Sequence, residues 1–578
     1  MNTDRKSYRL LIAALLIWLF GSGGSRAAAA DDAKFERVAN QFIEQLLIAH
    51  PEAATALGDH RFDTRVSDLS LRGVAADRRL YQSTLNKLEA ISAASLSANN
   101  AVDRSILMNE LRARLFDIEV VNEAQRNPLL YNPSNGIYSL LARDFAPLKS
   151  RLISVQARLE AVPKAVAAAQ ANLTNPPRIF TETAIMQNKG AISLVRGELD
   201  EHIKQEPTMR EKLAPAQASA IVALEAYGRW LETDLLPRST GDFRIGKAAF
   251  EKKLRFALDS DLSADEILRN AEAELKATQK TMLQTALPLY RNYFPNANTE
   301  GMETKAVIRA VLDKISETRP DNSNIVAKAN QTLAAATEFV RANNLVSVPS
   351  DPVKIIVMPE YARGVSVAYC DAAGALEKNG ETFYAISPTP VDWTAARTAS
   401  FYREYNDAML ANLTVHEAMP GHYLQIIVAN KVPTTTKIRH LIGSGTFIEG
   451  WATYAEQIMV DAGFGGPETK MQQMKMRLRL IINAIIDHKI HAGKMTQQEA
   501  IDLMMNEGFQ EDGEAAGKWK RAQLSSTQLS TYYIGNLEIN ALARDMKIKF
   551  GGDARSVHDR MLSFGSIATK HVRRLSGL

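Results

Sequence analysis

Residues 416–422 read HEAMPGH, and residues 449–456 read EGWATYAE. A histidine beside a glutamate, a second histidine further along and a glutamate from another segment are typical of a zinc site with three protein ligands and one position open for water. Zinc lowers the pKa of that water from about 16 to roughly 7, and a neighbouring carboxylate can take its proton. We therefore predict that His416, His422 and Glu449 bind Zn²⁺, which requires the two segments to lie side by side.

The interval between the two histidines departs from the common zinc motif H-E-x-x-H, in which they are four residues apart. Here they are six apart, and six residues of an undistorted helix turn a side chain by about 240°, which would point His422 away from His416. Pro420 and Gly421 lie inside the interval, where proline removes a helical N–H bond and glycine adopts angles that other residues avoid. We predict a kink or bulge from Met419 to Gly421 that returns His422 to the metal. The alternative is a helix that ends at Pro-Gly and leaves His422 on the surface.

The second segment offers two candidates for the third ligand. Glu449 and Glu456 are seven residues apart, and therefore lie within about 20° of each other on a helix. They flank apolar residues such as Trp451, and an acidic group beside apolar surface is costly unless it is paired or bound to metal. We predict that Glu449 is the ligand and that Glu456 orients a histidine. The reverse assignment stays open.

Composition and charge indicate a globular protein, and the N-terminal residues indicate export. Its 578 residues are 46% hydrophobic and 23% charged, and the net charge of +4 comes from many charges of both signs, which gives no reason to expect nucleic acid as a partner. Residues 1–30 combine basic residues, an apolar run over Leu10–Phe20 and small residues, as in a secretory signal peptide. We predict a periplasmic or secreted protein without a stable membrane span after cleavage; an uncleaved anchor is the alternative. Oligomeric state is not indicated.

Apolar residues recur at helical spacing through most of the chain, which predicts a mainly α fold. The predicted helices cover 33–49, 150–173, 208–235, 263–287, 303–317, 322–343, 468–491 and 496–507. Strand-like residues are confined mainly to 352–387, which predicts a small β-sheet next to the metal-binding helix. We predict a helical scaffold region over 31–240 and a zinc-binding catalytic region over 241–578, with a soft boundary near Ser239–Asp242 or one continuous domain.

The metal-binding segments resemble those of the bacterial domain-of-unknown-function 885 family, a zincin-like group. The segments that carry the resemblance are HEAMPGHYLQ (416–425), EGWATYAE (449–456), GDHRFDTRVSDLS (58–70), LLARDFAPLKSRL (140–152) and FYAISPTPVDW (383–393). The resemblance implies a mostly helical zincin-like fold, zinc and hydrolysis of peptide bonds. It also makes Glu449 similar to the third ligand in the EGxA segment of gluzincin aminopeptidases.

Near the C-terminus the family's pattern is approximately R-Y-x-x-x-P-G-Q-x-x-S-Y-x-x-G. The residues that match this pattern are Arg521, Gln528, Tyr532 and Gly535. The chain departs from it where the pattern has Tyr, Pro and Gly, because these positions hold Ala522, Ser526 and Thr527. A tyrosine hydroxyl or an arginine can stabilise the oxyanion that forms when hydroxide attacks a carbonyl. We predict that Tyr532 has this role and that Arg521 binds substrate. Tyr533 competes with Tyr532, and both are alternatively packing aromatics.

Three further residues, His491, Tyr369 and Trp393, are predicted to lie at the site. DHKIH (487–491) resembles a family segment, and His491 is predicted to bond substrate or transition state, whereas His488 is expected to be an ordinary surface histidine. Tyr369 and Trp393 are predicted to line the substrate groove, with a place in the core as the alternative.

The leading hypothesis is an exported zinc peptidase that hydrolyses peptide bonds, with short peptides as substrates and Glu417 as general base. One alternative is a non-catalytic exported binding or scaffold protein that keeps the fold. The other is a zinc hydrolase of non-peptide amides or esters. The presence of a general base favours the enzyme, because a purely structural zinc site has no use for one and is closed by four ligands.

Overall fold

The computed structural model describes residues 29–578 except 298–300, 360–366, 378–379 and 391–392. The predicted signal peptide, residues 1–30, lies outside the described residues except for its last two. The described chain is mainly helical with one small sheet, which confirms the predicted fold class. Among the helices described, none is both long and apolar enough to cross a membrane.

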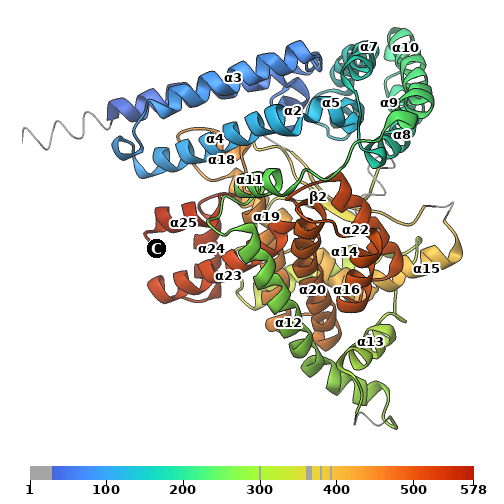
Figure 1. The fold of residues 1–578 in the computed structure, drawn as a ribbon, viewed down its shortest axis with the longest axis vertical. Helices are drawn as coiled ribbons and strands as arrows, with labels where there is room; N and C mark the ends of the chain where they lie inside the picture. The colour runs from blue at the N-terminus through green and yellow to red at the C-terminus, as the bar shows by residue number, and fades with distance from the viewer. Residues whose placement is uncertain (1–28, 298–300, 360–366, 378–379, 391–392) are drawn as a thin grey trace, which may run out of the picture.

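The N-terminal helices form the upper part of the molecule in Figure 1, where α3 and α4 run along one edge and α7 to α10 gather at its end. Serine side chains begin two of them: Ser70 accepts the backbone N–H of Gly73, and Ser97 accepts that of Asn100. The helices of this part cover residues 29–49, α2 Pro51–Ala56, α3 Leu71–Glu89, α4 Ala98–Phe116, α5 Glu123–Arg126, α6 Ser134–Leu141, α7 Leu148–Asn172, α8 Arg178–Ser193, α9 Leu199–Gln205 and α10 Arg210–Trp230.

Most of the remaining helices form the lower part in Figure 1, where α19, α20, α22 and α23 lie together near the long helix α12, whereas α18 lies against α4. The predicted capping boxes are present: Ser263 with Glu266 begins α12, and Thr496 with Glu499 begins α21. The helices are α11 Lys247–Leu258, α12 Ala264–Tyr293, α13 Thr304–Ile315, α14 Ile325–Ala342, α15 Ala395–Glu404, α16 Asp407–Glu417, α17 His422–Asn430, α18 Ile438–Leu441, α19 Gly445–Asp461, α20 Gly466–His491, α21 Gln497–Asp502, α22 Asp512–Leu524, α23 Ser530–Phe550, α24 Ala554–Leu562 and α25 Thr569–Ser576.

The predicted strand region forms one sheet of three described strands. These are β1 Val353–Val357, β2 Ala368–Asp371 and β3 Thr382–Ile386. β3 lies in the centre, pairs parallel with β1 and antiparallel with β2, and places Tyr384 opposite both Ile355 and Cys370. The hydroxyl groups of Tyr384 and Thr414 are 3.4 Å apart, so the central strand contacts α16 directly. Cys370, the chain's single cysteine, is a free thiol, and burial raises its pKa.

Buried hydrophobic side chains form three clusters. One lies within residues 131–235 and another within 250–534, so the predicted boundary near 239–242 falls between them. The third cluster joins residues 35–115 to residues 325–572. The first helices therefore share a core with the helices that carry the predicted metal ligands, and the division into two domains remains a prediction.

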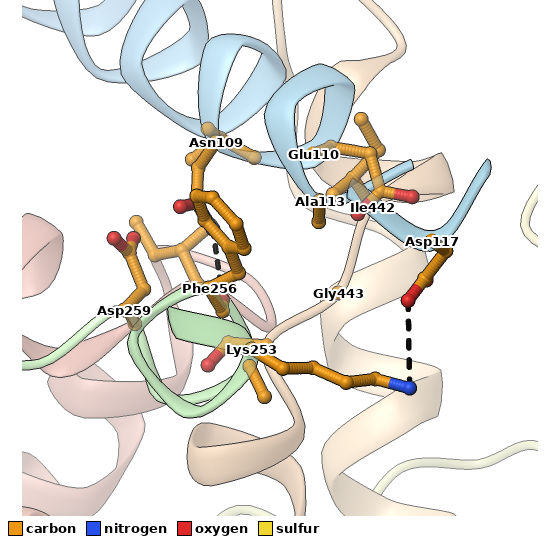
Figure 2. A pocket seen from close by; sticks show the side chains of 14 residues that line it. Asn109, Glu110, Ala113, Asp117, Lys253, Phe256, Asp259, Ile442 and Gly443 are labelled. Atoms are coloured by element: carbon orange, nitrogen blue, oxygen red, sulfur yellow. Dashed lines mark hydrogen bonds and ion pairs between the residues drawn. The ribbon is translucent and has the colours of Figure 1, made fainter. Parts of the chain in front are cut away.

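A second link between the two parts lies where α4 meets α11. Asn109 of α4 donates a hydrogen bond of 2.9 Å to the carbonyl of Phe256, and the Lys253 ammonium lies 3.4 Å from the Asp117 carboxylate (Figure 2). A cavity of about 260 Å³ separates the helices beside these contacts. Polar contacts thus connect the N-terminal helices to the site-bearing part in addition to the shared core.

Candidate metal centre

The predicted distortion lies between α16, which ends at Glu417, and α17, which begins at His422. It starts one residue earlier than expected, because Ala418 already has φ −126° and ψ −80°. The backbone N–H of Gly421 turns back and donates to the carbonyl of Val415 at 3.0 Å. A Cβ at this position would lie closer than 3.0 Å to the carbonyl oxygens of Val415 and His416, so the turn requires glycine.

A buried tryptophan fixes this turn against the second motif. Trp451 of α19 is fully buried, and its indole N–H donates to the carbonyl of Pro420 at 2.8 Å. The indole N–H can only donate, so burying it requires an acceptor such as this carbonyl. The hydrogen bond therefore sets the position of the HEAMPGH turn relative to the helix that carries Glu449.

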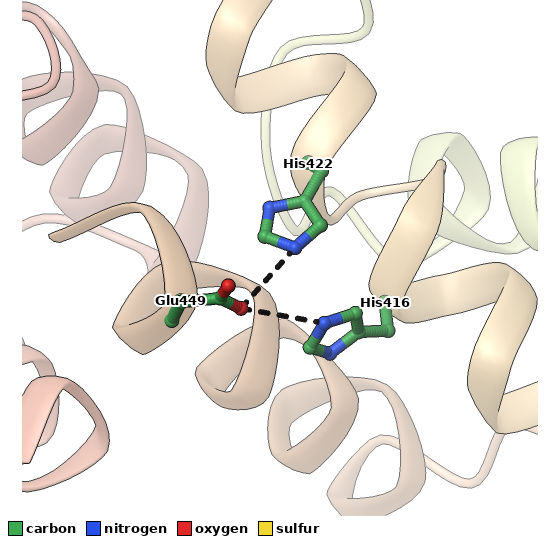
Figure 3. A group of neighbouring side chains, drawn as sticks. All are labelled: His416, His422 and Glu449. Atoms are coloured by element: carbon green, nitrogen blue, oxygen red, sulfur yellow. Dashed lines mark ion pairs between the residues drawn. The ribbon is translucent and has the colours of Figure 1, made fainter. Parts of the chain in front are cut away.

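The turn brings the three predicted ligands together (Figure 3). The rings of His416 and His422 are perpendicular, with centroids 4.7 Å apart. Glu449 Oε2 lies 3.7 Å from His416 Nε2 and 3.4 Å from His422 Nε2, and the possible donor atoms all lie within 4.8 Å of one another. Four donors placed tetrahedrally about 2.0–2.2 Å from zinc are about 3.3–3.6 Å apart. These spacings are long for hydrogen bonds and fit donors that surround one ion.

The other nitrogen of His416 is held by Glu456. His416 Nδ1 lies 2.7 Å from Glu456 Oε1, and the amide of Asn412 donates to Glu456 Oε2 at 2.7 Å. A carboxylate on one imidazole nitrogen fixes the tautomer in which the other nitrogen can bind a metal. The geometry therefore favours Glu449 as ligand and Glu456 as the orienting residue, which is the assignment predicted from the sequence.

Electrostatics of the group also fit a cation. Burial alone would lower the pKa of His416, but Glu449 and Glu456 outweigh it and raise that pKa well above its usual value. Burial alone would raise the pKa of Glu449, but His416 and His422 hold it well below the usual range. Glu449 Oε2 and His422 Nδ1 are buried and have no hydrogen-bond partner among the described residues. A buried acceptor left unpaired is costly, and a metal ion would satisfy Glu449 Oε2.

His416 and the adjacent Glu417 lie in the wall of a cavity of about 1080 Å³. Other parts of the wall come from α8, α15, α20 and α22, so a helix of the predicted scaffold region closes one side. Val367 and Ala368, at the start of β2, also line the cavity. β2 is an edge strand that pairs with β3 on one side and with no other described strand. At its far end the carbonyl of Asp371 accepts from Arg143 at 2.9 Å, so only the start of the strand, near Val367 and Ala368, faces the cavity.

Tyr532 faces this cavity, and Tyr533 faces away from it. Tyr532 lines the cavity beside Arg521, whose guanidinium donates to its hydroxyl oxygen at 2.8 Å. The hydroxyl of Tyr533 instead donates to Glu274 of α12 at 3.0 Å. Burial raises the pKa of Tyr532 to about 12, the negative charge of Glu449 adds to the rise, and Arg521 opposes it. The sequence left open whether Tyr532 or Tyr533 faces the site. The orientation of α23 places Tyr532 in the cavity wall.

Two predicted site residues are not brought to the cavity. His491 is buried, stacks on Phe250 with ring centroids 6.0 Å apart, and places Nε2 2.8 Å from the carbonyl oxygens of Ala522 and Ser525. These contacts support the end of α22, so the geometry gives His491 a structural position and not the predicted contact with substrate. Tyr369 is also absent from the cavity wall, because it follows Ala368 on a strand and points to the opposite face.

The structure adds wall residues that the sequence analysis did not select. Glu404 is fully buried, accepts from Lys475 at 2.8 Å and from Arg479, and accepts the backbone N–H of Glu511 at 2.8 Å. Burial would raise the pKa of Glu404, but Lys475 and Arg479 outweigh it and lower that pKa. This network joins α15, α20 and the start of α22. Its only signal in the sequence is a few charges on otherwise apolar helices.

Trp393 and Lys518 complete the charged and aromatic part of the wall. Trp393 lines the cavity, as predicted, and the guanidinium of Arg397 lies 3.8 Å from its ring centroid. Lys518 lines the cavity from α22 and is buried. The basic run GKWKR at 517–521 was a signal for it, but the sequence analysis used only Arg521.

Among the solved structures that match this chain are two that are similar over nearly its whole length. One is described as a "putative lipoprotein of unknown function" from Shewanella oneidensis; it is 31% identical, has a TM-score of 0.75, and the match covers 94% of this chain and 100% of the other. The second is described as a "putative lipoprotein" from Colwellia psychrerythraea; it is 16% identical, has a TM-score of 0.77, and the match covers 95% and 99%. The second likeness shows a shared fold.

A search of curated proteins gave no match. The model of one family does match, over residues 51–575, and that family is described as "Bacterial protein of unknown function (DUF885)". The match spans nearly all of the described chain and includes both HEAMPGH (416–422) and EGWATYAE (449–456). The protein therefore belongs to the DUF885 family.

Proposed function

We propose that this protein is an exported zinc-dependent peptidase that hydrolyses short peptides. The observation that carries the proposal is the group formed by His416, His422 and Glu449, whose spacing suits one ion, next to Glu417 in the wall of a large cavity. Two imidazoles and one carboxylate leave a tetrahedral zinc ion with one free position, which is the arrangement of catalytic sites.

The donor set suits zinc. His416 and His422 would each offer Nε2 and Glu449 would offer Oε2, while Glu456 keeps the ring of His416 oriented. Zinc supplies Lewis acidity when bound at such a site, which makes water acidic enough to lose a proton near neutral pH. Nitrogen and carboxylate oxygen ligands without thiolates fit this use.

Glu417 is the residue that moves the proton. Its carboxylate takes a proton from the attacking water as the water oxygen forms a bond to the carbonyl carbon. The same carboxyl then gives the proton to the amide nitrogen as the C–N bond breaks, so the peptide leaves as an acid and an amine. Glu417 directly follows a proposed ligand and lines the cavity, as this role requires.

Tyr532 is the proposed donor to the oxyanion. Its oxygen already accepts hydrogen bonds from Arg521 at 2.8 Å and from Gln528 at 3.4 Å, which leaves its own O–H free to donate. Because burial raises its pKa to about 12, the hydroxyl stays protonated at neutral pH. Hydrogen-bond donors aimed at developing charge contribute strongly to the rate.

Cavity size and strand position support a peptide substrate. A volume of about 1080 Å³ holds a short peptide and excludes a folded domain. The start of β2, which lines the cavity, offers backbone groups to an extended peptide, as in recognition by strand addition. Export is supported by the signal-like residues 1–30 and by the description of both structural relatives as putative lipoproteins.

The test is the variant Glu417→Gln, assayed on a library of short peptides with one equivalent of zinc. Turnover is expected to fall by about 100-fold or more while zinc content is unchanged, because general-base work contributes on the order of 10²–10⁴. Glu338→Gln, at an exposed glutamate of α14, is the matched control and should keep wild-type turnover. Full activity of Glu417→Gln would refute the mechanism. Hydrolysis of esters without peptides would favour the non-peptide hydrolase, and a protein that binds no zinc would favour the scaffold.

A further inference from the structure

Three cationic side chains of α22 line the cavity: Lys518, Lys520 and Arg521. Lys518 and Arg521 are three residues apart, so they share one face of the helix, and both line the cavity that contains His416 and Glu417. The Lys518 ammonium makes no hydrogen bond to any residue in the described part of the chain. Its nearest carboxylate is Glu514, at 3.9 Å.

Glu514 is already occupied by other groups. Its Oε2 accepts from the hydroxyl of Tyr405 at 2.7 Å, and its Oε1 lies 3.6 Å from Arg479 Nη1. A carboxylate shared in this way compensates little of the charge on Lys518. Burial lowers the pKa of Lys518 to about 7, and the positive charge of Arg521 adds to this effect. Both effects indicate a buried cation that lacks a full counterion.

Arg521 has only neutral partners. Its Nη2 donates to the hydroxyl of Tyr532 at 2.8 Å and to Gln528 Oε1 at 3.0 Å. Within the described ranges, no carboxylate oxygen lies within 4.0 Å of the Arg521 guanidinium nitrogens, which is the limit for an ion pair. Arg479 of the same wall differs, because it is paired with the buried Glu404. Since an unpaired buried charge is costly, Lys518 and Arg521 together form a site for an anion.

We infer that Lys518 and Arg521 bind the C-terminal carboxylate of the peptide, on the side of the leaving amine. This inference rests on the proposed function and names the substrate class within it: short peptides with a free C-terminus. The planar guanidinium and the ammonium are the donors that carboxylates prefer, and Arg521 has donors left after its bonds to Tyr532 and Gln528.

The position of Tyr532 limits how far this carboxylate lies from the scissile bond. If Tyr532 donates to the oxyanion at about 2.7–3.1 Å, the guanidinium of Arg521 is at most about 6 Å from that oxygen, because it lies 2.8 Å from the tyrosine hydroxyl. One extended residue spans about 3.5 Å. The bound carboxylate therefore belongs to the first or second residue after the scissile bond, which describes removal of one or two residues from the C-terminus.

Binding can be measured apart from turnover. The experiment uses the full chain with Glu417→Gln, loaded with zinc, and isothermal titration calorimetry with one tripeptide prepared as the free acid and as the C-terminal amide. The acid should bind about 10- to 100-fold more tightly than the amide, as expected for hydrogen bonds to charged groups. Lys518→Met should reduce this ratio to about threefold or less without changing the affinity for the amide, and Lys518→Arg should restore it.

Lys489→Met is the matched control, because Lys489 of α20 lies outside the cavity wall and its ammonium pairs with Glu272 at 2.6 Å. It should keep the wild-type ratio. Equal affinities for acid and amide, an unchanged ratio in Lys518→Met, or no binding of either peptide would overturn the inference. A third peptide, amidated but ending in glutamate, tests the other source of a carboxylate; tight binding of this peptide alone would also overturn it. If the ratio and its dependence on Lys518 hold but the wild-type protein hydrolyses no peptide, the proposed function fails and the carboxylate site stands.

Discussion

Glutamine in place of Glu456 keeps the size of the side chain and removes its charge. Glu456 lies 2.7 Å from His416 Nδ1 through Oε1 and accepts from Asn412 at 2.7 Å through Oε2. A glutamine amide has one acceptor oxygen, so one of these two buried donors would face an NH₂ group. His416 would lose either its orienting hydrogen bond or the group that fixes it.

The size of the effect follows from these contacts. A hydrogen bond to a charged group contributes about 1.5–3 kcal/mol, which corresponds to roughly 10- to 150-fold in an equilibrium constant. Loss of a residue that orients a metal ligand typically weakens metal affinity by about 10- to 100-fold. We therefore expect Glu456→Gln to bind zinc about 10- to 100-fold more weakly than the wild type. Glu449→Gln should weaken zinc binding further, because it removes the negative charge of a proposed ligand.

The assay is competition with a chromophoric zinc chelator at fixed pH, with Glu338→Gln as the exposed control in α14. Circular dichroism of each variant shows whether the helices are retained. Wild-type affinity in Glu456→Gln would refute the orienting role. A larger loss in Glu456→Gln than in Glu449→Gln would make Glu456 the ligand and reverse the assignment.

Three further outcomes are expected. Gly421→Ala should weaken zinc binding by at least about tenfold in the same competition assay, because overpacking costs about 1–3 kcal/mol; Gly197→Ala, where a Cβ meets nothing within 4 Å, should not. Tyr532→Phe should lower kcat by about 10²–10³ with KM little changed, as for loss of one oxyanion donor, whereas Tyr533→Phe should keep kcat. Steady-state kinetics against pH should show KM for a free-acid peptide rising above pH of about 7, because Lys518, whose pKa burial lowers to about 7, loses its charge there; KM for the amide should stay flat.

Local chemistry made the grouping of His416, His422 and Glu449 predictable. The proposed ligands are recognised by residue type and spacing, and the Pro-Gly interruption predicts how His422 returns to His416. The helices were equally predictable from the sequence, because the period of 3.6 residues and the capping boxes at Ser263 and Thr496 are local signals. The small sheet also followed from composition alone.

Residues whose place depends on packing were less predictable. His491 lies eight residues beyond Asn483, which lines the cavity, and eight residues extend a helix by about 12 Å. The motif placed His491 on the right helix, and only the packing of α20 shows that this end lies under α22. For Tyr369, a shift of one residue exchanges the two faces of a strand, so the pattern alone could not decide its side.

The sequence does not show which distant segments form the cavity walls. α8 closes the cavity from residues more than 200 positions before the metal ligands. The network of Glu404, Lys475 and Arg479 joins three helices through buried charges whose partners can be identified only in three dimensions. The neutral surroundings of Arg521 became visible in the same way, and they carry the inference about the C-terminal carboxylate.

The most direct test of this account is the position of zinc in crystals of the full chain, located by anomalous diffraction at the zinc absorption edge. We expect one peak about 2.0–2.2 Å from His416 Nε2, His422 Nε2 and the Glu449 carboxylate. Crystals grown with one equivalent of zinc that show no peak there, or a peak held by other residues, would contradict it.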